Sequence, residues 1–334
     1  MITLGIETSC DDTAAALIEN EGKILSNVLT SQNEFHKDFG GIVPEIASRK
    51  HAELIGYVLL EALKIAEINL NSIDLISVTK GPGLVGSLLI GIETAKSLSF
   101  ALNKPLIGVN HLEGHIYSLF LEGSPLYKKE NSFPLLILIV SGGHTELIIM
   151  KDHLSFEVIG KTRDDAAGEA IDKFARHLGY DYPGGPVIEK IGSSGNPSAF
   201  KFPTLSFKGS PYEFSFSGLK TSGVYFIDKN PELIKNELNN VVASFEYALA
   251  KILVDRTLRA SSDYKVKGIG VVGGVSANTR LREMFNNKSS VPVFFPPKRF
   301  STDNAAMIAL AGLKHFNRGE QHSLRLDAYS RLEI

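Results

Sequence analysis

Two histidines spaced four residues apart are the sharpest chemical signal in this sequence. They are His111 and His115, separated by Leu-Glu-Gly. On an α-helix, residues i and i+4 project from the same face, so both imidazoles can bind one metal ion. Glu113 lies between them, and at about 100° per residue it points to roughly the opposite side of the helix. This geometry predicts a metal site and argues against a metalloprotease in which the glutamate activates a metal-bound water.

A third metal ligand is predicted at Asp303, within the segment Ser-Thr-Asp-Asn. Taken alone, this segment is also typical of a helix N-cap, because an Ala-rich helical run follows it. Asp303 follows a predicted strand, however, as His111 does in the first half of the chain. We therefore expect His111, His115 and Asp303 to bind one divalent cation. Two histidines and one carboxylate suit Fe(II) or Zn(II) and leave positions open for water or substrate.

Two turns with small or acidic residues form a second class of signal. Ser141, Gly142 and Gly143 open a turn between two predicted strands, where backbone N–H groups can cradle a phosphate. A tight hairpin would also explain these glycines. Asp11 and Asp12 occupy the matching turn of the first half. They can hold a metal-bound phosphate or simply satisfy turn amides.

Three polar residues are candidates for binding a nucleoside. Asp172 lies too far into a helix that is predicted to start with Asp164 as its N-cap, so capping does not explain it. Its carboxylate can accept hydrogen bonds from a ribose or an amine, and Glu189 can add another. The glycine-rich segment that ends at Asn278 admits a flat purine, and the Asn278 amide can donate and accept at once.

The elements that must position these residues repeat weakly at about half the chain length. In each half, three short apolar runs separated by turns predict three strands, and a strand, a helix and a further strand follow. The predicted strands are 2–6, 14–18, 24–29, 75–78 and 105–109, and then 135–140, 147–150, 154–159, 268–272 and 291–295. Helices are predicted from Pro44 and over about 231–260.

Strands that alternate with helices call for right-handed parallel crossovers and a sheet covered on both faces. We therefore predict an α/β protein with two related lobes, each built on a mixed sheet, around a central cleft. The first lobe is predicted to comprise residues 1–110 plus about 304–334. The second is predicted to comprise 111–303, with an irregular insert at about 193–225.

Composition excludes several other classes of protein. With 334 residues, 43% of them hydrophobic, the chain can bury a sizeable core, and its net charge of −2 gives no global positive field for nucleic acid. Any RNA contact must use a local patch or a partner. Cys10 is the only cysteine, so no intrachain disulfide can form. The longest wholly apolar stretch, 133–140, is far shorter than the ~18 residues of a membrane span, and we expect a soluble cytoplasmic protein without a membrane segment.

Taken together, these motifs resemble the universal tRNA threonylcarbamoyladenosine synthase subunit of the TsaD type, once described as an O-sialoglycoprotein endopeptidase. The resemblance covers essentially the whole chain. It depends on Glu7–Asp11, Gly81–Gly83, Asn110–His115, Ser141–Thr145, Asp165–Lys173, Pro183–Pro186, Gly273–Val275, Asn278 and Thr302–Asn304. One departure is Ser301, where the family often has cysteine.

The resemblance implies an actin-like ATPase (ASKHA) fold and an acyltransferase. Such proteins transfer threonylcarbamoyl from threonylcarbamoyl-AMP to the N6 amine of the adenosine 3′ of the anticodon, in tRNAs that read codons beginning with A. It implies a metal at His111, His115 and Asp303, with Fe(II) preferred to Zn(II). It also implies that the adenylate is held by Ile139, Val140, Ser141, Gly142, Gly143, Asp172, Gly185, Glu189 and Asn278.

Two functional points go beyond this set. Asp11 is our candidate for the base that takes the proton from the attacking amine. The resemblance also implies bacterial partners, namely a TsaB-like paralogue that forms a heterodimer and a TsaE-like ATPase. The alternatives are a small-molecule kinase of the same fold, which would need an acidic residue where this chain has His144, and a noncatalytic nucleotide-binding scaffold.

Overall fold

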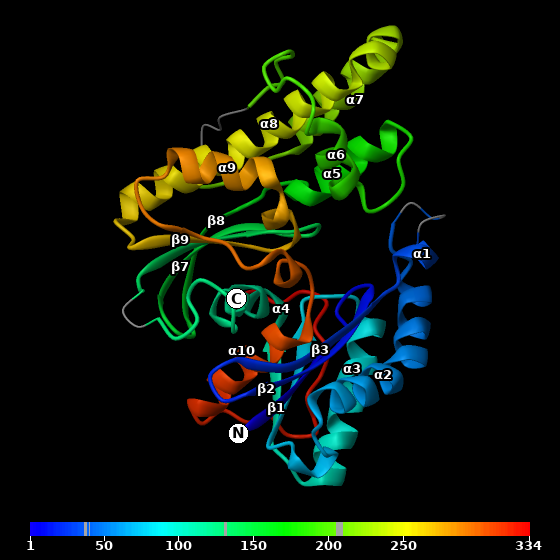
Figure 1. Cartoon of the computed structure of the whole chain (residues 1–334), viewed down its shortest axis with the longest axis vertical. Coiled ribbons are helices and arrows are strands. Elements are labelled where there is room, and N and C mark those ends of the chain that lie inside the picture. The colour runs from blue at the N-terminus through cyan, green and yellow to red at the C-terminus, as the bar shows by residue number, and fades with distance from the viewer. Residues whose placement is uncertain (37–38, 40, 130–131, 205–209) are drawn as a thin grey trace. The chain divides into compact units, whose positions relative to one another are not determined.

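The computed structural model describes residues 1–36, 39, 41–129, 132–204 and 210–334 and divides the chain into two α/β units (Figure 1). The first unit comprises Met1–Glu130 and Pro296–Ile334, and the second comprises Asn131–Phe295. These boundaries differ from the predicted ones, since residues 111–130 and 296–303 fall in the first unit. The reason is that α4 (His111–Tyr117) packs against α10 (Ala305–Asn317), which covers the first sheet.

The first unit contains a five-stranded mixed sheet in the order β3-β2-β1-β4-β5. Its strands are β1 (Ile2–Glu7), β2 (Asp12–Glu19), β3 (Lys23–Ser31), β4 (Leu75–Gly81) and β5 (Leu106–Asn110). The first three are antiparallel, whereas β4 and β5 run parallel to β1. Because helices cover both faces, β1 and β4 are buried along nearly their whole length.

Helices of the first unit lie on opposite faces of its sheet. Leu4 and Ile6 of β1 share a core with α2 (Pro44–Ala66) and α3 (Val85–Leu102). Gly5 between them faces α10. The alternation of side chains along a strand therefore assigns α10 to the other face.

The second unit repeats this topology, with the order β10-β9-β6-β7-β8. Its strands are β6 (Leu135–Val140), β7 (Thr145–Asp152), β8 (Ser155–Lys161), β9 (Gly268–Val272) and β10 (Val293–Phe294). The first three are antiparallel, and β9 and β10 run parallel to β6. The predicted repeat of three strands followed by two parallel strands is confirmed in both halves.

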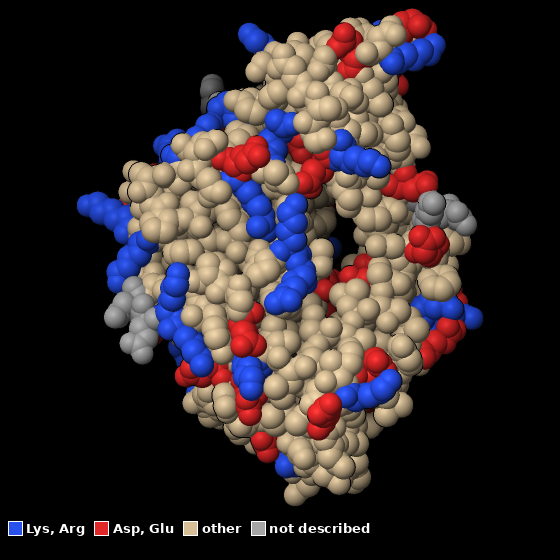
Figure 2. Space-filling model, in the orientation of Figure 1, with Lys and Arg blue, Asp and Glu red and all other residues tan. Residues whose placement is uncertain are grey.

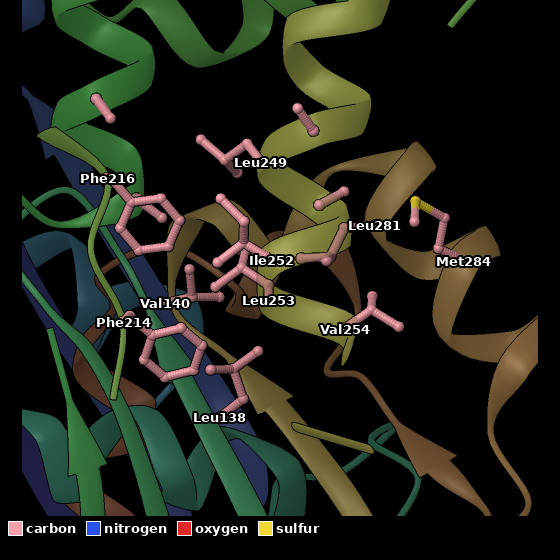
Figure 3. Close-up of a cluster of buried hydrophobic side chains, with 14 of the residues drawn as sticks. Leu138, Val140, Phe214, Phe216, Leu249, Ile252, Leu253, Val254, Leu281 and Met284 are labelled. Atoms are coloured by element: carbon pink, nitrogen blue, oxygen red, sulfur yellow. The ribbon is translucent and has the colours of Figure 1, made fainter. Parts of the chain in front are cut away.

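Within its described residues, the second unit also contains five α-helices. They are α5 (Ala167–His177), α6 (Gly184–Gly192), α7 (Ser217–Lys229), α8 (Pro231–Tyr264) and α9 (Thr279–Lys288). Figure 3 shows Leu249, Ile252 and Leu253 of α8 packed with Phe214 and Phe216 in the hydrophobic core. The remaining short elements are α1 (Asn33–His36) and the 3-10 turns Leu70–Ser72, Ser118–Phe120, Gly274–Ala277 and Lys298–Phe300.

Two local predictions in the second unit were wrong in detail. The insert expected at 193–225 is irregular in its described part up to Phe216, but residues 217–225 belong to α7. Residues 205–209 lie outside the described residues. Asp164 does not cap α5, whose N-cap is Ala166. Asp164 Oδ1 instead accepts hydrogen bonds from the amides of Phe216 and Ser217 at the start of α7, at 2.7 and 3.2 Å.

One helix among the described residues, α3, is long and apolar enough to cross a membrane by length and composition alone. Such a single helix is weak evidence for a span, because core helices pass the same test. Leu88, Ile92 and Ala95 of α3 are buried in the core of the first unit, where the helix packs against α2 and β4. We interpret α3 as a core helix.

Candidate functional site

The two histidines are placed by a capped helix that starts directly after β5. Asn110, the last residue of β5, caps α4 by accepting a hydrogen bond at Oδ1 from the amide of Leu112 at 2.8 Å. His111 is therefore the first residue of α4, and His115 follows one turn later on the same side. Both are buried, and their rings meet edge to face with centroids 4.7 Å apart.

Asp303 meets the two histidines within the first unit. Its Oδ1 lies 3.5 Å from His111 Nε2 and 3.2 Å from His115 Nε2. One ligand atom from each of the three residues lies within 4.8 Å of the others. The alternative use of Asp303 as an N-cap does not apply, because Asn304 caps α10 through a 3.0 Å hydrogen bond from the amide of Met307.

The surroundings of the two imidazoles fit a metal ion. His111 Nδ1 lies 3.0 Å from Glu7 Oε2 and donates to it, which leaves Nε2 as the ring nitrogen that could bind a metal ion. Within the described part of the chain, neither buried ring nitrogen of His115 makes a hydrogen bond, and Nε2 has only its 3.2 Å contact with Asp303. A buried nitrogen without a partner is costly in a site without a cation, whereas a metal ion would satisfy it.

Glu7 also contacts His111 of the histidine pair, although the sequence predicted no role for it beyond its place in the Glu7–Asp11 motif. It is fully buried at the end of β1, and its Oε2 also accepts a hydrogen bond from Thr79 Oγ1 at 2.6 Å. The sequence signal that could have found Glu7 is its place directly after a predicted core strand. A carboxylate in such a place is rarely buried unless it has a partner. Glu7 orients His111 from behind, as outer carboxylates do for histidine metal ligands.

Acidic groups crowd this end of the first sheet. Burial alone would lower the pKa of His111, but Asp303 and Glu7 raise it to about 9. Burial, Asp303 and Asp11 raise the pKa of Asp12 to about 7. These carboxylates disfavour one another's charge, so a cation among them would be stabilising.

Asp11 and Cys10 lie in the turn between β1 and β2. Asp11 is 8% exposed, and its carbonyl oxygen accepts a hydrogen bond from the amide of Gln32 at 3.1 Å. Burial and the neighbouring Asp11 raise the pKa of the Cys10 thiol well above its usual value. The thiol therefore stays protonated, which argues against a nucleophilic role for Cys10.

Glu113 points away from the histidine pair, as the helical spacing predicts. Its Oε2 lies 2.6 Å from His315 Nε2 on α10. Burial opposes a charge on His315, but the pairs with Glu113 and Glu320 outweigh it and raise the pKa of His315. Glu113 thus joins α4 to α10 and has no part in the His-His-Asp cluster.

We expect Glu113→Gln to retain most of the activity of the wild-type protein and to lose stability in a pH-dependent way. Because the folded-state pKa of His315 is raised, the ion pair stabilises the fold below the unfolded pKa near ~6.5, and its contribution disappears as pH rises through the folded value. The variant should lose about 1–2 kcal/mol at pH 6 and less at pH 9, measured by urea unfolding. Glu45→Gln, at an exposed pair, is the control. An equal loss at both pH values would contradict this assignment.

The other predicted residues lie in the second unit, at the end of β6 and the turn after it, in α5 and α6, and at the start of α9. The side chains of Ile139 and Val140 are buried in the sheet, so only their backbone is available to a ligand. Gly142 and Gly143 follow in the β6–β7 turn, where an added Cβ would meet nothing within 4 Å. The amide of Gly168 in the first turn of α5 donates to the Ser141 carbonyl at 3.2 Å. A hydrogen bond from α5 therefore holds the start of this turn, and there is free space beside its two glycines.

Asp172 and Gly185 lie together between α5 and α6. Asp172 Oδ1 accepts a hydrogen bond from the amide of Gly184 at 2.8 Å. Burial raises the pKa of Asp172, although the Gly184 amide and Arg176 oppose that rise. The carboxylate thus fixes the start of α6, where Gly185 has no atom within 4 Å of an added Cβ.

Glu189 and Asn278 meet at the start of α9. Glu189 Oε1 accepts hydrogen bonds from the amide and Oγ1 of Thr279, at 3.2 and 2.6 Å. Asn278 Oδ1 caps α9 by accepting from the Leu281 amide at 2.9 Å. This oxygen keeps a second lone pair, so the expectation that the Asn278 amide both donates to and accepts from a purine stays a prediction.

Comparisons with known proteins identify first the class and then the family. The fold is that of the actin-like ATPases: the chain resembles HypF from T. kodakarensis (TM-score 0.60, 14% identity, 95% of this chain and 48% of that chain). It also resembles the activator of 2-hydroxyisocaproyl-CoA dehydratase from Clostridium difficile with bound ADPNP (TM-score 0.54, 14% identity, 97% and 99%). These likenesses, like that to a ROK family glucokinase from Streptomyces griseus (TM-score 0.52, 12% identity, 93% and 98%), concern the fold alone.

In sequence, the chain is far more similar to the members of one family than to these solved structures. Residues 23–310 match the family described as TsaD, tRNA N6-adenosine threonylcarbamoyltransferase. Proteins of that name from Clostridium kluyveri and Thermosipho melanesiensis are each 50% identical to this chain. The matches cover 99% of this chain and 97% of the first relative, and 100% of both chains for the second. The chain therefore belongs to the tRNA N6-adenosine threonylcarbamoyltransferase family.

Proposed function

We propose that this protein transfers the threonylcarbamoyl group from threonylcarbamoyl-AMP to the N6 amine of the adenosine 3′ of the anticodon, in tRNAs that read codons beginning with A. The observation that carries this proposal is 50% identity to proteins of that name over nearly the whole chain. The kinase alternative is not favoured, because the family match is specific whereas the kinases share only the fold.

His111, His115 and Asp303 are the proposed metal ligands, and Glu7 orients His111. The His-His-carboxylate set suits Fe(II) or Zn(II), with Fe(II) preferred because the family resemblance implies it. When bound, such an ion supplies Lewis-acid stabilisation of negative charge. The chain itself supplies buried, acidic surroundings for these ligands, since His111, His115 and Glu7 are all buried.

The second unit is proposed to hold the adenylate donor. Gly142 and Gly143 are exposed and their backbone amides suit a phosphate, while Asp172 suits a ribose hydroxyl or an amine. Gly185 leaves space beside Asp172, while Glu189 and Asn278 line the start of α9. The backbone of Ile139, Val140 and Ser141 leads into the glycine turn. The glycine turn follows β6 and Asn278 comes after β9, which runs parallel to β6, and this supports the role because open α/β sheets bind ligands beyond the carboxyl ends of such strands.

The reaction is an acyl transfer without an enzyme-bound intermediate. The adenosine N6 attacks the carbamoyl carbon, the bond from that carbon to the phosphate oxygen breaks, and AMP leaves with the electron pair. The amine must lose a proton in this step, and Asp11 is our proposed acceptor. Its position in the acidic turn after β1 supports this choice, because it belongs to the same group of carboxylates as Asp303.

Contact with tRNA requires local positive charge, because the protein as a whole is slightly acidic. Figure 2 shows basic and acidic side chains interspersed on the displayed face. Lys298 and Arg299 are exposed and lie just before Asp303 in the sequence. We propose that these two residues contact tRNA phosphates.

A TsaB-like paralogue and a TsaE-like ATPase are the proposed protein partners, and the cytoplasm is the proposed compartment. Apolar side chains exposed on the neighbouring helices α2 and α3 support a protein partner of the first unit. They are Tyr57, Leu60 and Ile65 on α2, and Val85, Leu89 and Phe100 on α3, with Phe100 78% exposed. Substitution of Phe100 and Leu60 by serine should weaken a heterodimer with the paralogue, measured by analytical ultracentrifugation.

The proposed activity is tested by mass analysis of nucleosides. Purified tRNA is incubated with this protein, its partners, threonine, bicarbonate and ATP, or directly with threonylcarbamoyl-AMP. Threonylcarbamoyladenosine should form at the position 3′ of the anticodon. If it does not form with the donor supplied, the proposal is wrong, and ATP consumption without tRNA would favour a kinase.

We expect Asn278→Ala to keep its metal and to bind nucleotide about tenfold more weakly than the wild-type protein, because a hydrogen-bond donor is lost. The α9 cap is lost as well, which should cost about 1 kcal/mol of stability. Isothermal titration with AMP and metal analysis of the same preparation measure both effects. Loss of metal in this variant, or unchanged AMP affinity, would remove Asn278 from the nucleotide site.

A further inference from the structure

One buried carboxylate of the second unit has no role in the proposal above. Glu246 of α8 is 4% exposed. Its Oε1 accepts a hydrogen bond from Asn278 Nδ2 at 2.6 Å, and its Oε2 accepts one from Arg280 Nε at 2.6 Å. Arg280 Nη2 also donates to the carbonyl oxygen of Gly192, the last residue of α6, at 3.0 Å. Glu246 therefore joins α8 to the start of α9 and, through Arg280, to the end of α6.

Stability alone is a poor explanation for this arrangement. The cost of removing two charges from water is often as large as their attraction, and apolar replacements of buried pairs are often neutral. The neighbouring residue of α8, Phe245, stacks on Phe174 with ring centroids 3.7 Å apart, so the surroundings of Glu246 could also accommodate an apolar side chain. What the ionic pair provides instead is a defined geometry around Asn278.

The hydrogen bonds define which way the Asn278 amide points. Its Oδ1 must face the Leu281 amide, because that amide is a donor. Its Nδ2 must then face Glu246, whose ionised carboxylate only accepts. An amide nitrogen carries two hydrogens, and Glu246 takes one of them. The second hydrogen is therefore fixed in direction.

We infer that Glu246 is a positioning residue for the nucleotide end of the acyl donor, since it orients Asn278 so that its second Nδ2 hydrogen is offered to the ligand. The inference rests on the proposed function, because it takes Asn278 as a nucleotide-binding residue. Arg280 keeps the carboxylate in place and ties it to α6, the helix that carries Gly185 and Glu189. The same network thus fixes both helices that line the proposed nucleotide site.

The first test replaces Glu246 by glutamine in the full-length, metal-loaded protein. The carboxamide oxygen would stay with Arg280, so its NH2 group would oppose Asn278 Nδ2, donor against donor. AMP affinity should fall about tenfold, with unchanged metal content. In the transfer assay, the KM for threonylcarbamoyl-AMP should rise by a similar factor, while kcat stays within about twofold. Glu232→Gln, at an exposed position of the same helix, is the matched control and should change neither value.

A second variant separates positioning from mere support of the fold. In the double variant Glu246→Gln with Asn278→Asp, the new glutamine donates to the new aspartate, whose other oxygen still caps α9. The net charge of the pair is unchanged. The double variant should regain the unfolding midpoint that Glu246→Gln loses, but it should not regain AMP affinity, because the donor toward the ligand is absent.

The outcomes distinguish this inference from the function on which it rests. Unchanged AMP affinity in Glu246→Gln would overturn the inference, and so would full recovery of affinity in the double variant, which would make the role purely structural. A wild-type protein that binds no AMP would overturn the proposed nucleotide site itself. Weakened binding in Glu246→Gln without recovery in the double variant supports the inference.

Discussion

Asp303→Ala is expected to remove stoichiometric metal from the protein and to reduce threonylcarbamoyl transfer at least about a hundredfold, while the protein stays folded. The reason is that Asp303 supplies the carboxylate of the His-His-Asp cluster, at 3.2 Å from His115 and 3.5 Å from His111. The fold should survive because Asn304, and not Asp303, caps α10. His111→Ala and His115→Ala should behave in the same way.

Metal content and activity are measured on the same preparations, by elemental analysis and by nucleoside mass analysis. Circular dichroism and the unfolding midpoint report whether each variant is folded. Asp327→Ala, an exposed carboxylate of the first unit, and Glu113→Gln, on the same helix as the histidines, are the controls. Full metal occupancy in Asp303→Ala would exclude this residue as a ligand.

Gly5→Ala is expected to weaken metal binding at least about tenfold and to destabilise the protein by about 1–3 kcal/mol. A Cβ at position 5 would lie 2.1 Å from the carbonyl oxygen of Ala305 and 2.8 Å from the amide nitrogen of Ala309. Both atoms belong to the backbone of α10, so the helix itself must move. Ala305 begins α10 two residues after Asp303, and a shift of this turn would carry the carboxylate away from the histidines.

The matched control is Gly56→Ala on the exposed face of α2, where an added Cβ meets nothing within 4 Å. This change should leave metal affinity unchanged and stabilise the protein by up to about 1 kcal/mol, because alanine is the better helix former. Urea unfolding and metal titration compare the two variants. If Gly5→Ala is destabilised but binds metal as tightly as the wild-type protein, α10 does not position Asp303 as we infer.

The sequence by itself determined the strands, their repeat and the paired histidines. Strand runs such as 2–6 and 135–140 are apolar because helices cover both faces, and that burial leaves a pattern that local residues report. The i, i+4 spacing of His111 and His115 is likewise local, and so is the opposite direction of Glu113. For the same reason, the prediction that Glu113 points away from the histidine pair agrees with its observed contact with His315.

Only the tertiary structure decided which partners these residues meet. Glu7 lies about a hundred positions from His111, yet their side chains are 3.0 Å apart. Glu246 on α8 accepts a hydrogen bond from Asn278, and Asp164 accepts one from the amide of Phe216 at the start of α7 and does not cap α5. The boundaries of the two units also differ from the predicted ones, because α4 packs on α10, which comes from near the end of the chain. A sequence pattern reports periodicity and burial over a few turns, whereas a hydrogen bond between distant segments depends on how whole elements pack, which no local pattern records.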